Sequence, residues 1–367
     1  MKVTIIAGAR PNFMKIAPII HEIIRRQKEG QTIDYRLVHT GQHYDKKLSQ
    51  TFFEQLNIPE PHINLNIGSG SQAEQTAGIM IAFEKELLMN PSDLVLVVGD
   101  VTSTMACSIV AKKLNIKVAH VEAGIRSFDL TMPEEINRMV TDSITDYFYV
   151  TSQVAIDNLL KLGIKEEAIQ FVGNTMIDTL IANLDRLVAP DEYSKLELNS
   201  KEYIVLTMHR PANVDGEQKL KLFLEEIVKS SKGLPVIFPT HPRTKVILSK
   251  LKIEYPNLHL IDPLGYLEFN YLVKHSLCVI TDSGGITEET TYMGIPCLTL
   301  RDNTERPETI TEGTNELVGT NPKAIQKAME KIFTNQWKLG SIPKFWDGKT
   351  SERIVNHLLQ LKVDNEI

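Results

Sequence analysis

Two short apolar runs, each ending at an acidic residue, constrain the fold more than any other feature of the chain. Residues 95–98 read Val-Leu-Val-Val and end at Gly99-Asp100, whereas residues 118–121 read Val-Ala-His-Val and end at Glu122. Such continuous apolar runs are typical of parallel strands that are covered on both faces. Because ligands of open α/β sheets bind beyond the carboxyl ends of the strands, we expect Asp100 and Glu122 to lie at one edge of a sheet, beside a ligand.

Two further acids, Glu134 and Glu135, follow in a segment that can bring them over the same edge. Several carboxylates in one place suit proton transfer better than phosphate binding. Each acid also has a structural interpretation. Asp100 could cap the next helix, and one of Glu134 and Glu135 could complement a helix dipole. Capping is less expected for Glu122, because Ala-Gly follows it.

The composition predicts a two-domain globular protein and argues against several classes of function. At 367 residues the chain has room for about two domains. Its net charge of −6, with basic and acidic residues interspersed, argues against nucleic-acid binding. No run approaches the roughly 20 apolar residues of a membrane span. The three cysteines lack CxxC spacing, so we expect reduced thiols in a cytoplasmic protein, with no metal site.

The first half alternates strands and helices, which predicts a parallel, doubly wound sheet. Besides the two central runs, strands are predicted at residues 2–7, 35–40, 63–67, 147–151 and 169–172. The first strand ends at a Gly-containing turn, and Arg10 and Lys15 follow in a helix from about Pro11. This turn is either a phosphate site or a solvated helix start. It lacks the GxGxxG pattern, so no dinucleotide cofactor is expected.

The second half repeats the alternation but ends its strands in cations and glycines. Strands are predicted at residues 203–208, 235–240, 258–261, 277–281 and 295–300. Basic residues near this edge are His209, Arg210, His241, Arg243 and Arg306. They surround a turn, Ser283, Gly284 and Gly285, that begins a helix, which predicts a pyrophosphate site on helix amides. Glu289, one turn later, could accept hydrogen bonds from ribose hydroxyls. A plain strand-to-helix turn is the alternative.

Together, these patterns predict a two-lobed α/β enzyme. It would bind a nucleoside diphosphate on the second domain and present the group attached to that diphosphate to carboxylates of the first domain.

Eight motifs in this order resemble the non-hydrolysing UDP-N-acetylglucosamine 2-epimerases: GARPNFMK, VGDVTST, HVEAGIRS, PEEINR, HRP, THPR, DSGGITEE and TERPE. The match runs from Lys2 to about Gly319, and the ending WDGKTSERIV fits too.

The resemblance implies two Rossmann-like domains of the GT-B type with the active site in the cleft between them. The expected domains are residues 1–174, carrying the carboxylates, and residues 175–349, binding UDP. The last helix, within residues 350–367, would pack back on the first domain. The implied activity is reversible epimerisation at C2 of UDP-N-acetylglucosamine to UDP-N-acetylmannosamine, in which UDP leaves to give a glycal and then adds back. No cofactor, metal, nucleic acid or membrane is implied. The implied partners are a UDP-sugar and a second subunit in a homodimer.

Residue by residue, the resemblance also implies roles. The catalytic residues would be Asp100, Glu122, Glu134 and His209. The substrate-binding residues would be Arg10, Lys15, Phe269, Ser283, Gly284, Gly285, Glu289 and Arg306. In bacterial relatives a second, activating UDP-sugar binds residues that match Gln42, Gln72, Glu135, Arg210 and His241. An Arg of that site is replaced here by Ser71, which predicts weak or absent activation.

Two other enzymes compete with this interpretation. A GT-B glycosyltransferase would share the UDP site but would rarely need three acids on the first domain. A 2-epimerase of a modified sugar, such as UDP-2,3-diacetamido-2,3-dideoxyglucuronate, would need an additional cation for the uronate. A non-catalytic UDP-sugar sensor would tolerate loss of the catalytic carboxylates. Asp100, Glu122 and Glu134 are all present, which argues against a sensor.

Overall fold

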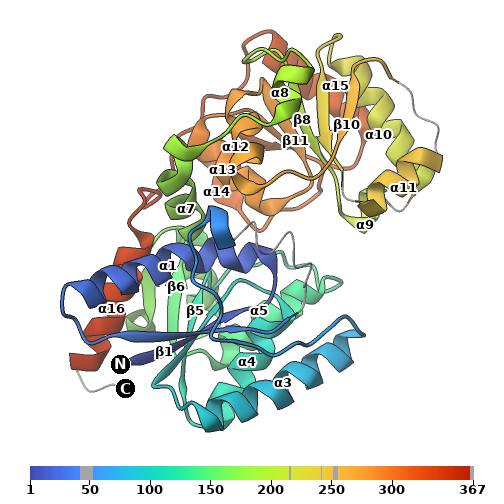
Figure 1. Ribbon diagram of the computed structural model, residues 1–367. Helices are drawn as coiled ribbons and strands as arrows, with labels where there is room; N and C mark the ends of the chain where they lie inside the picture. Colours follow the sequence, from blue (N-terminus) through green and yellow to red (C-terminus); the bar gives the residue numbers. More distant parts are fainter. Residues whose placement is uncertain (42–52, 215, 241, 251–254, 364–367) are drawn as a thin grey trace. The chain divides into compact units, whose positions relative to one another are not determined.

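The computed structural model describes residues 1–41, 53–214, 216–240, 242–250 and 255–363. For residues 10, 211–212, 242–243, 249–250 and 362–363 only the backbone is described. The chain divides into two compact units (Figure 1). Unit 1 comprises Met1–Ala182 and Lys344–Ile367, and unit 2 comprises Asn183–Pro343.

Unit 1 is built on a seven-stranded parallel sheet in the order β3-β2-β1-β4-β5-β6-β7. Its strands are β1 (Lys2–Ala7), β2 (Asp34–His39), β3 (Ile63–Asn64), β4 (Leu94–Val98), β5 (Lys117–Val121), β6 (Tyr147–Val150) and β7 (Ile169–Phe171). Its helices are α1 (Arg10–Lys28), α3 (Gln72–Met89), α4 (Thr102–Lys113), α5 (Pro133–Ile144), α6 (Gln153–Lys161), α7 (Thr175–Asn183, which ends at the boundary) and α16 (Thr350–Val363), with a short 3₁₀ turn, η1 (Glu166–Ala168).

Helices cover both faces of the unit 1 sheet (Figure 1). Apolar residues of α3 and α4 pack on one face against Ile6, Val95 and Val97. On the other face α1 and α16 lie side by side, and Arg26 Nη2 donates a hydrogen bond to Asn356 Oδ1 at 2.5 Å. The last helix is therefore part of unit 1.

Unit 2 contains a six-stranded parallel sheet in the order β10-β9-β8-β11-β12-β13. Its strands are β8 (Ile204–Thr207), β9 (Val236–Pro239), β10 (Leu258–Ile261), β11 (Cys278–Thr281), β12 (Cys297–Thr299) and β13 (Asn315–Leu317). Its helices are η2 (Leu184–Arg186), α8 (Asp191–Lys195), α9 (Pro211–Val214), α10 (Glu217–Ser230), α11 (Pro242–Lys250), α12 (Tyr266–His275), α13 (Gly284–Met293), α14 (Pro307–Thr311) and α15 (Pro322–Phe333).

Both sheets follow the doubly wound order in which the chain first adds strands in one direction and then in the other. The order in which strands are added reverses between β1 and β4 in unit 1, and between β8 and β11 in unit 2. Ligands of such sheets bind where the order switches. The predicted α/β fold class is thus confirmed, and the two switch points locate the edges that matter for function.

Three local expectations differ from the structure. β3 ends at Asn64 rather than at residue 67, because Asn66 takes a positive φ of 55° that extended backbone cannot accommodate. The polar segment 186–200, in which no helix was predicted, contains α8 and places Leu198 in the core of unit 2. β13 went unpredicted, since Asn-Glu-Leu is too short and polar to show a strand pattern.

Candidate active site

The switch point of unit 1 brings Asp100 and Glu122 to one edge of the sheet. β4 and β5 pair in register, with Val98 opposite Val121, so each acid follows its strand at the same level. The N–H of Gly99 continues the pairing by donating to Val121 O at 3.0 Å. The placement predicted from the two apolar runs is therefore observed.

Glu122 is buried and forms an ion pair with Lys15. Lys15 Nζ lies 2.7 Å from Glu122 Oε2, and the two side chains are 12% and 3% exposed. Glu122 adopts a φ of +69°, which is uncommon for a residue with a side chain and typical of functional sites. Gly99 is required next to this pair, since its φ is +66° and a Cβ there would lie 2.9 Å from Lys15 Nζ.

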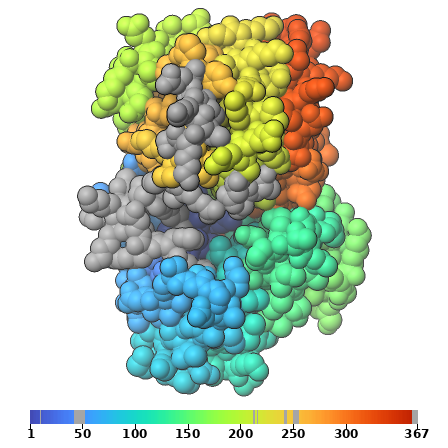
Figure 2. Space-filling model, turned by 90° about the vertical axis from the view of Figure 1, so that its right-hand side faces the viewer, coloured from blue at the N-terminus to red at the C-terminus, as the bar shows by residue number. Residues whose placement is uncertain are grey.

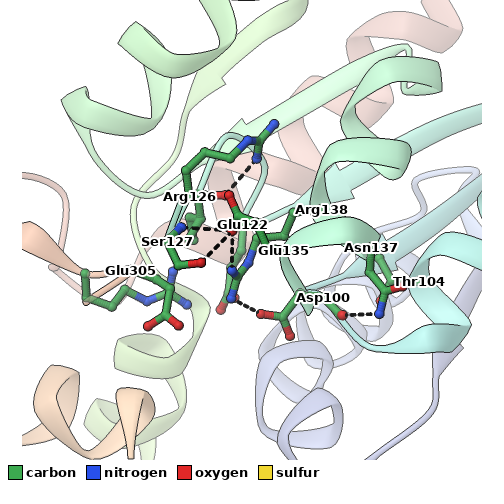
Figure 3. A network of polar contacts seen from close by, with 12 residues as sticks. Asp100, Thr104, Glu122, Arg126, Ser127, Glu135, Asn137, Arg138 and Glu305 are labelled. Carbon is green, nitrogen blue, oxygen red and sulfur yellow. Dashed lines mark hydrogen bonds and ion pairs between the residues drawn. The ribbon is translucent and has the colours of Figure 1, made fainter. Parts of the chain in front are cut away.

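Asp100 is paired with Arg138, which also holds Glu135. In Figure 3, Arg138 lies between the two acids, with Nη2 2.5 Å from Asp100 Oδ2 and Nη1 2.8 Å from Glu135 Oε2. The Asp100 side chain is 29% exposed. The N-cap of α4 is Val101, without a side-chain cap, so the interpretation of Asp100 as a helix cap is wrong.

The first turn of α5 places Glu135 and Glu134 in different surroundings. Glu135 is buried and accepts hydrogen bonds from Ser127 N and Oγ, both at 2.9 Å, and from Phe128 N at 3.1 Å. Burial raises the pKa of Glu135, but these bonds and Arg138 outweigh it and hold the pKa below the usual value. Glu134 is exposed and makes no hydrogen bond or ion pair within the described residues.

The switch point of unit 2 is organised around Asp282, which follows β11. The Asp282 carboxylate is fully buried and accepts the backbone N–H groups of His209 and Arg210 at 3.0–3.1 Å. His209 Nδ1 lies 2.9 Å from Asp282 Oδ1, while the His209 side chain is 59% exposed. Burial raises the pKa of Asp282, yet the hydrogen bonds from His209 and Arg210 bring it below the usual value. His209 is thus held at the edge with its ring facing outward.

The Ser-Gly-Gly turn begins α13 at the same edge. Ser283 is the N-cap and its side chain caps nothing, so the first amides of α13 are not used by that hydroxyl. Ser283, Gly284 and Gly285 are half-buried. Next to a Cβ built on Gly284 the closest atom is Glu305 Oε2, 4.0 Å away. This turn therefore has room beside it, as the predicted diphosphate site requires.

Three other predicted contacts of the nucleotide lie in unit 2. Arg306 is buried and its Nε lies 2.5 Å from Glu288 Oε1. Glu289 is buried and accepts a hydrogen bond from Asn270 Nδ2 at 3.4 Å; burial raises the pKa of Glu289 to about 7. Phe269 is half-buried and packs against the core of unit 2.

The residues predicted for a second UDP-sugar are only partly described. Gln42 and His241 lie outside the described residues, as does the side chain of Arg10, which was predicted to bind the substrate. Gln72 is exposed at the start of α3 and accepts a hydrogen bond from Thr102 Oγ1 at 3.3 Å. Arg210 Nε donates to the Asp282 carbonyl at 3.0 Å.

Gln72 also lines an open groove of about 450 Å³ between α3, α4 and α5, together with Met80, Met105 and Asn137. Both α3 and α5 reach the surface of unit 1, coloured blue and green-cyan in Figure 2. Asn137 Nδ2 donates to the Asp100 carbonyl at 2.8 Å, so the groove adjoins the carboxylate edge.

Ser71 has a structural function of its own. It is the N-cap of α3, where its Oγ accepts the N–H of Glu74 at 3.2 Å and its N–H donates to Glu74 Oε2 at 2.8 Å. This reciprocal capping box needs a short hydroxyl side chain. The replacement of Arg by Ser71 is thus accompanied by a helix start that an Arg could not cap in this way.

Two residues of the candidate site, Arg138 and Asp282, were not predicted from the sequence. Arg138 is the cation that joins Asp100 to Glu135, and its only signal was the i,i+3 spacing within PEEINR. Asp282 orients His209, and its only signal was its place directly after a strand.

Among the described residues no cluster of three His, Cys, Asp or Glu side chains could hold a metal ion.

The comparison with known families agrees with this geometry. Residues 25–359 match the family model described as UDP-N-acetylglucosamine 2-epimerase. This chain belongs to that family. As a UDP-N-acetylglucosamine 2-epimerase family member it is an isomerase with the two-domain fold of the GT-B type.

Relatives of the 2-epimerase family span nearly the whole chain. The UDP-N-acetylglucosamine 2-epimerase of Methanocaldococcus jannaschii is 44% identical over 98% of this chain and 99% of its own. A crystal structure of that enzyme in complex with UDP-GlcNAc and UDP has a TM-score of 0.86, with 43% identity over 98% of this chain and 100% of that one. The UDP-2,3-diacetamido-2,3-dideoxy-D-glucuronate 2-epimerase of Pseudomonas aeruginosa is 37% identical over 98% of this chain and 100% of its own.

Within the described part of the 2-epimerase chain, no helix is long and apolar enough to cross a membrane.

Proposed function

We propose that this protein interconverts UDP-N-acetylglucosamine and UDP-N-acetylmannosamine by inverting C2 of the sugar. The observation that carries the proposal is the pair of carboxylates at the unit 1 switch point. Asp100 and Glu122 end neighbouring strands, and each is matched with a cation, Arg138 or Lys15. The strand ends and the ion pairs hold these carboxylates in fixed positions, where they can act as acid and base. Epimerisation by proton transfer needs such positioned groups.

The proposed reaction is an elimination followed by an addition. A carboxylate removes the proton from C2 while the C1–O bond to UDP breaks, which leaves a glycal with a C1–C2 double bond. UDP then adds to C1 and a proton is delivered to C2 from the opposite face. Because no carbonyl group flanks C2, its proton is weakly acidic, and departure of UDP must develop together with proton removal.

Stabilisation of the departing UDP is the proposed task of unit 2. The negative charge that grows on the diphosphate would be met by His209, the amides of Ser283, Gly284 and Gly285, and Arg306. Groups aimed at developing charge stabilise the transition state more than the substrate. The outward-facing ring of His209, held by buried Asp282, is consistent with this role. Glu289 would accept hydrogen bonds from the ribose, with Phe269 near the uracil and Arg10 and Lys15 near the sugar.

The acid and the base are proposed to come from Asp100, Glu122 and Glu134. Glu135 is less suited to proton transfer, since four donors surround its carboxylate and hold its pKa low. Glu134 has no such partner within the described residues and remains accessible.

A second candidate is 2-epimerisation of a diacetamido uronic acid sugar on UDP. The similarity to the Pseudomonas aeruginosa enzyme over the full chain favours it. The same carboxylates would serve both reactions, and only the groups around C3 and C6 of the sugar would differ.

Product analysis by NMR with a panel of UDP-sugars tests the proposal. UDP-N-acetylglucosamine should be converted to an equilibrium mixture with UDP-N-acetylmannosamine, without added NAD or metal. Turnover of the diacetamido uronic acid sugar alone would favour the second candidate. Release of UDP with transfer of the sugar to an acceptor would contradict both.

A further inference from the structure

A histidine behind the two carboxylates has both ring nitrogens in contact with hydrogen-bond acceptors. His120 Nδ1 lies 2.7 Å from Asp142 Oδ1, and His120 Nε2 lies 2.8 Å from the carbonyl oxygen of Gly99. Both side chains of the His120–Asp142 pair are fully buried. Bulk solvent does not reach these side chains, so the hydrogens are assigned from the partners themselves.

The partners leave one assignment. A backbone carbonyl only accepts hydrogen bonds, so Nε2 must carry a hydrogen. The Asp142 carboxylate also accepts: its Oδ2 lies 2.7 Å from Arg126 Nη1 and 3.1 Å from the N–H of Gly124. Burial raises the pKa of Asp142, but the groups around the carboxylate outweigh it and hold the pKa below the usual value. One of them, Arg126, cannot lose its proton, so its ion pair favours the ionised carboxylate independently of His120. Nδ1 therefore also carries a hydrogen, which makes His120 an imidazolium.

The contacts of this imidazolium end at the residues that flank both candidate catalytic acids. Gly99, whose carbonyl it binds, directly precedes Asp100. His120 itself lies two residues before Glu122 on β5, and Gly124, which donates to Asp142, lies two residues after it. Glu122 sits between these anchors with its positive φ of 69°.

We propose that His120 is a positioning residue: a buried imidazolium that ties Asp142 to the Gly99 carbonyl and thereby sets where the Asp100 and Glu122 carboxylates stand. It does not touch the substrate. This inference rests on the proposed function for the roles of Asp100 and Glu122, but the protonation of His120 stands apart from it.

Charge balance supports a buried cation at this place. Among the described residues, the charged groups that form ion pairs at this end of the sheet are Lys15 on α1, Asp100 after β4, His120 and Glu122 on or after β5, Arg126 in the following loop, and Glu135, Arg138 and Asp142 on α5. Four carboxylates face three Lys or Arg cations, so a protonated His120 makes the group neutral. Buried charges are tolerated when each is paired in this way.

The protonation is tested on the wild-type protein by NMR of the ¹⁵N-labelled histidine rings at neutral pH. The His120 signals, assigned by their loss in His120→Gln, should show a bound hydrogen on both nitrogens. An unprotonated Nδ1 or Nε2 would overturn the proposal. This result does not depend on which sugar the enzyme converts, so it fails or holds separately from the proposed function.

The positioning role is tested by two amide substitutions. The amide nitrogen of Gln reaches as far as Nε2 and can still bind the Gly99 carbonyl, whereas that of Asn reaches only as far as Nδ1. With whichever UDP-sugar is turned over fastest, His120→Asn should lower kcat by about 10²-fold with little change in KM, because small misplacements of reacting groups cost about this much. His120→Gln should retain clearly more activity.

The matched control is His21→Gln, at an exposed histidine on α1 that contacts the Asn57 carbonyl. It should leave kcat unchanged. Equal loss of kcat in His120→Asn and His120→Gln, at equal thermal stability, would overturn the role of the Gly99 contact. A change in KM alone would place His120 in substrate binding and contradict the proposal in the same way.

Discussion

The two units share one sheet topology but carry different side chains at the point where the strand order switches. In unit 1 this edge carries Asp100 and Glu122, whereas in unit 2 it carries His209 and the Ser-Gly-Gly turn. The same architecture is therefore proposed to serve two chemical tasks, which differ in the residues that follow the strands. Fold and task are separate properties of such a sheet.

The units also differ in how they treat buried acids. In unit 1, Glu122, Glu135 and Asp142 are each paired with a cation. In unit 2, burial raises the pKa of Glu289 and of Glu308 to about 7 each. Neither carboxylate oxygen of Glu308 has a hydrogen-bond partner among the described residues. Glu289 and Glu308 of unit 2 are thus buried acids that titrate near neutral pH, unlike Glu135 and Asp142 of unit 1, whose pKa values lie below the usual range.

The largest expected effect concerns the acids of unit 1. Asp100→Asn and Glu122→Gln should each lower kcat by at least about 10²-fold, because each removes a proton-transfer group or its charge. The affinity for UDP should change little, since unit 2 is proposed to bind it. Steady-state kinetics and calorimetric UDP titration measure the two effects, with Asp157→Asn on the exposed face of α6 as control. Weakened UDP binding without loss of kcat would reverse the assigned tasks.

The corresponding experiment in unit 2 tests whether His209 binds UDP. His209→Ala should weaken UDP binding by about 10- to 150-fold, which corresponds to one hydrogen bond to a charged group of about 1.5–3 kcal/mol. Turnover should fall as well. His259→Ala, on the edge strand β10, is the matched control and should bind UDP normally. Unchanged UDP affinity in His209→Ala would show that the imidazole of His209 does not bind the diphosphate.

Substitutions of Glu134 and Glu135, the neighbouring acids of α5, should affect different properties: catalysis for Glu134 and stability for Glu135. Glu134→Gln should lower kcat by about 10²-fold and leave thermal stability unchanged, because Glu134 is exposed. Glu135→Gln should instead reduce the free energy of unfolding by about 1.5–3 kcal/mol, since it weakens charged hydrogen bonds to residues 127–128 and Arg138. If Glu134→Gln is as active as wild type, Glu135 becomes the candidate catalytic acid of this helix.

The last expected effect concerns stability alone and tests Glu308, a buried acid of unit 2. The folded pKa of Glu308 is about 7 and its ordinary value is 4.5, so the folded state keeps a proton that the unfolded state releases in this window. Stability is then lost as pH rises from about 4.5 to about 7. Glu308→Gln should therefore be more stable than wild type above pH 7, by at most about 3.5 kcal/mol, at about 1.4 kcal/mol per pKa unit.

Chemical denaturation across this pH range measures the effect, with Glu312→Gln at an exposed position of the same region as control. A difference between Glu308→Gln and wild type that grows as pH falls would contradict the assignment.

Much of the fold could be predicted because buried parallel strands are apolar along their whole length, as in residues 95–98 and 204–206. Acids placed directly after such strands were also predictable, since strand ends meet at one edge. The partners of those acids were not. Arg138 contacts Asp100, and His120 together with Asp142 contacts the Gly99 turn, from helix or strand positions that have no distinctive local pattern. Their roles follow from tertiary packing alone.

The central claim is that the carboxylates of unit 1 exchange the C2 proton while UDP is held by unit 2. It is tested most directly by incubating UDP-N-acetylglucosamine with the protein in D₂O and following the sugar by NMR and mass spectrometry. We predict that UDP-N-acetylmannosamine forms and that both epimers gain deuterium at C2. Epimerisation with the original hydrogen retained at C2 would contradict proton exchange with the solvent and the proposed elimination.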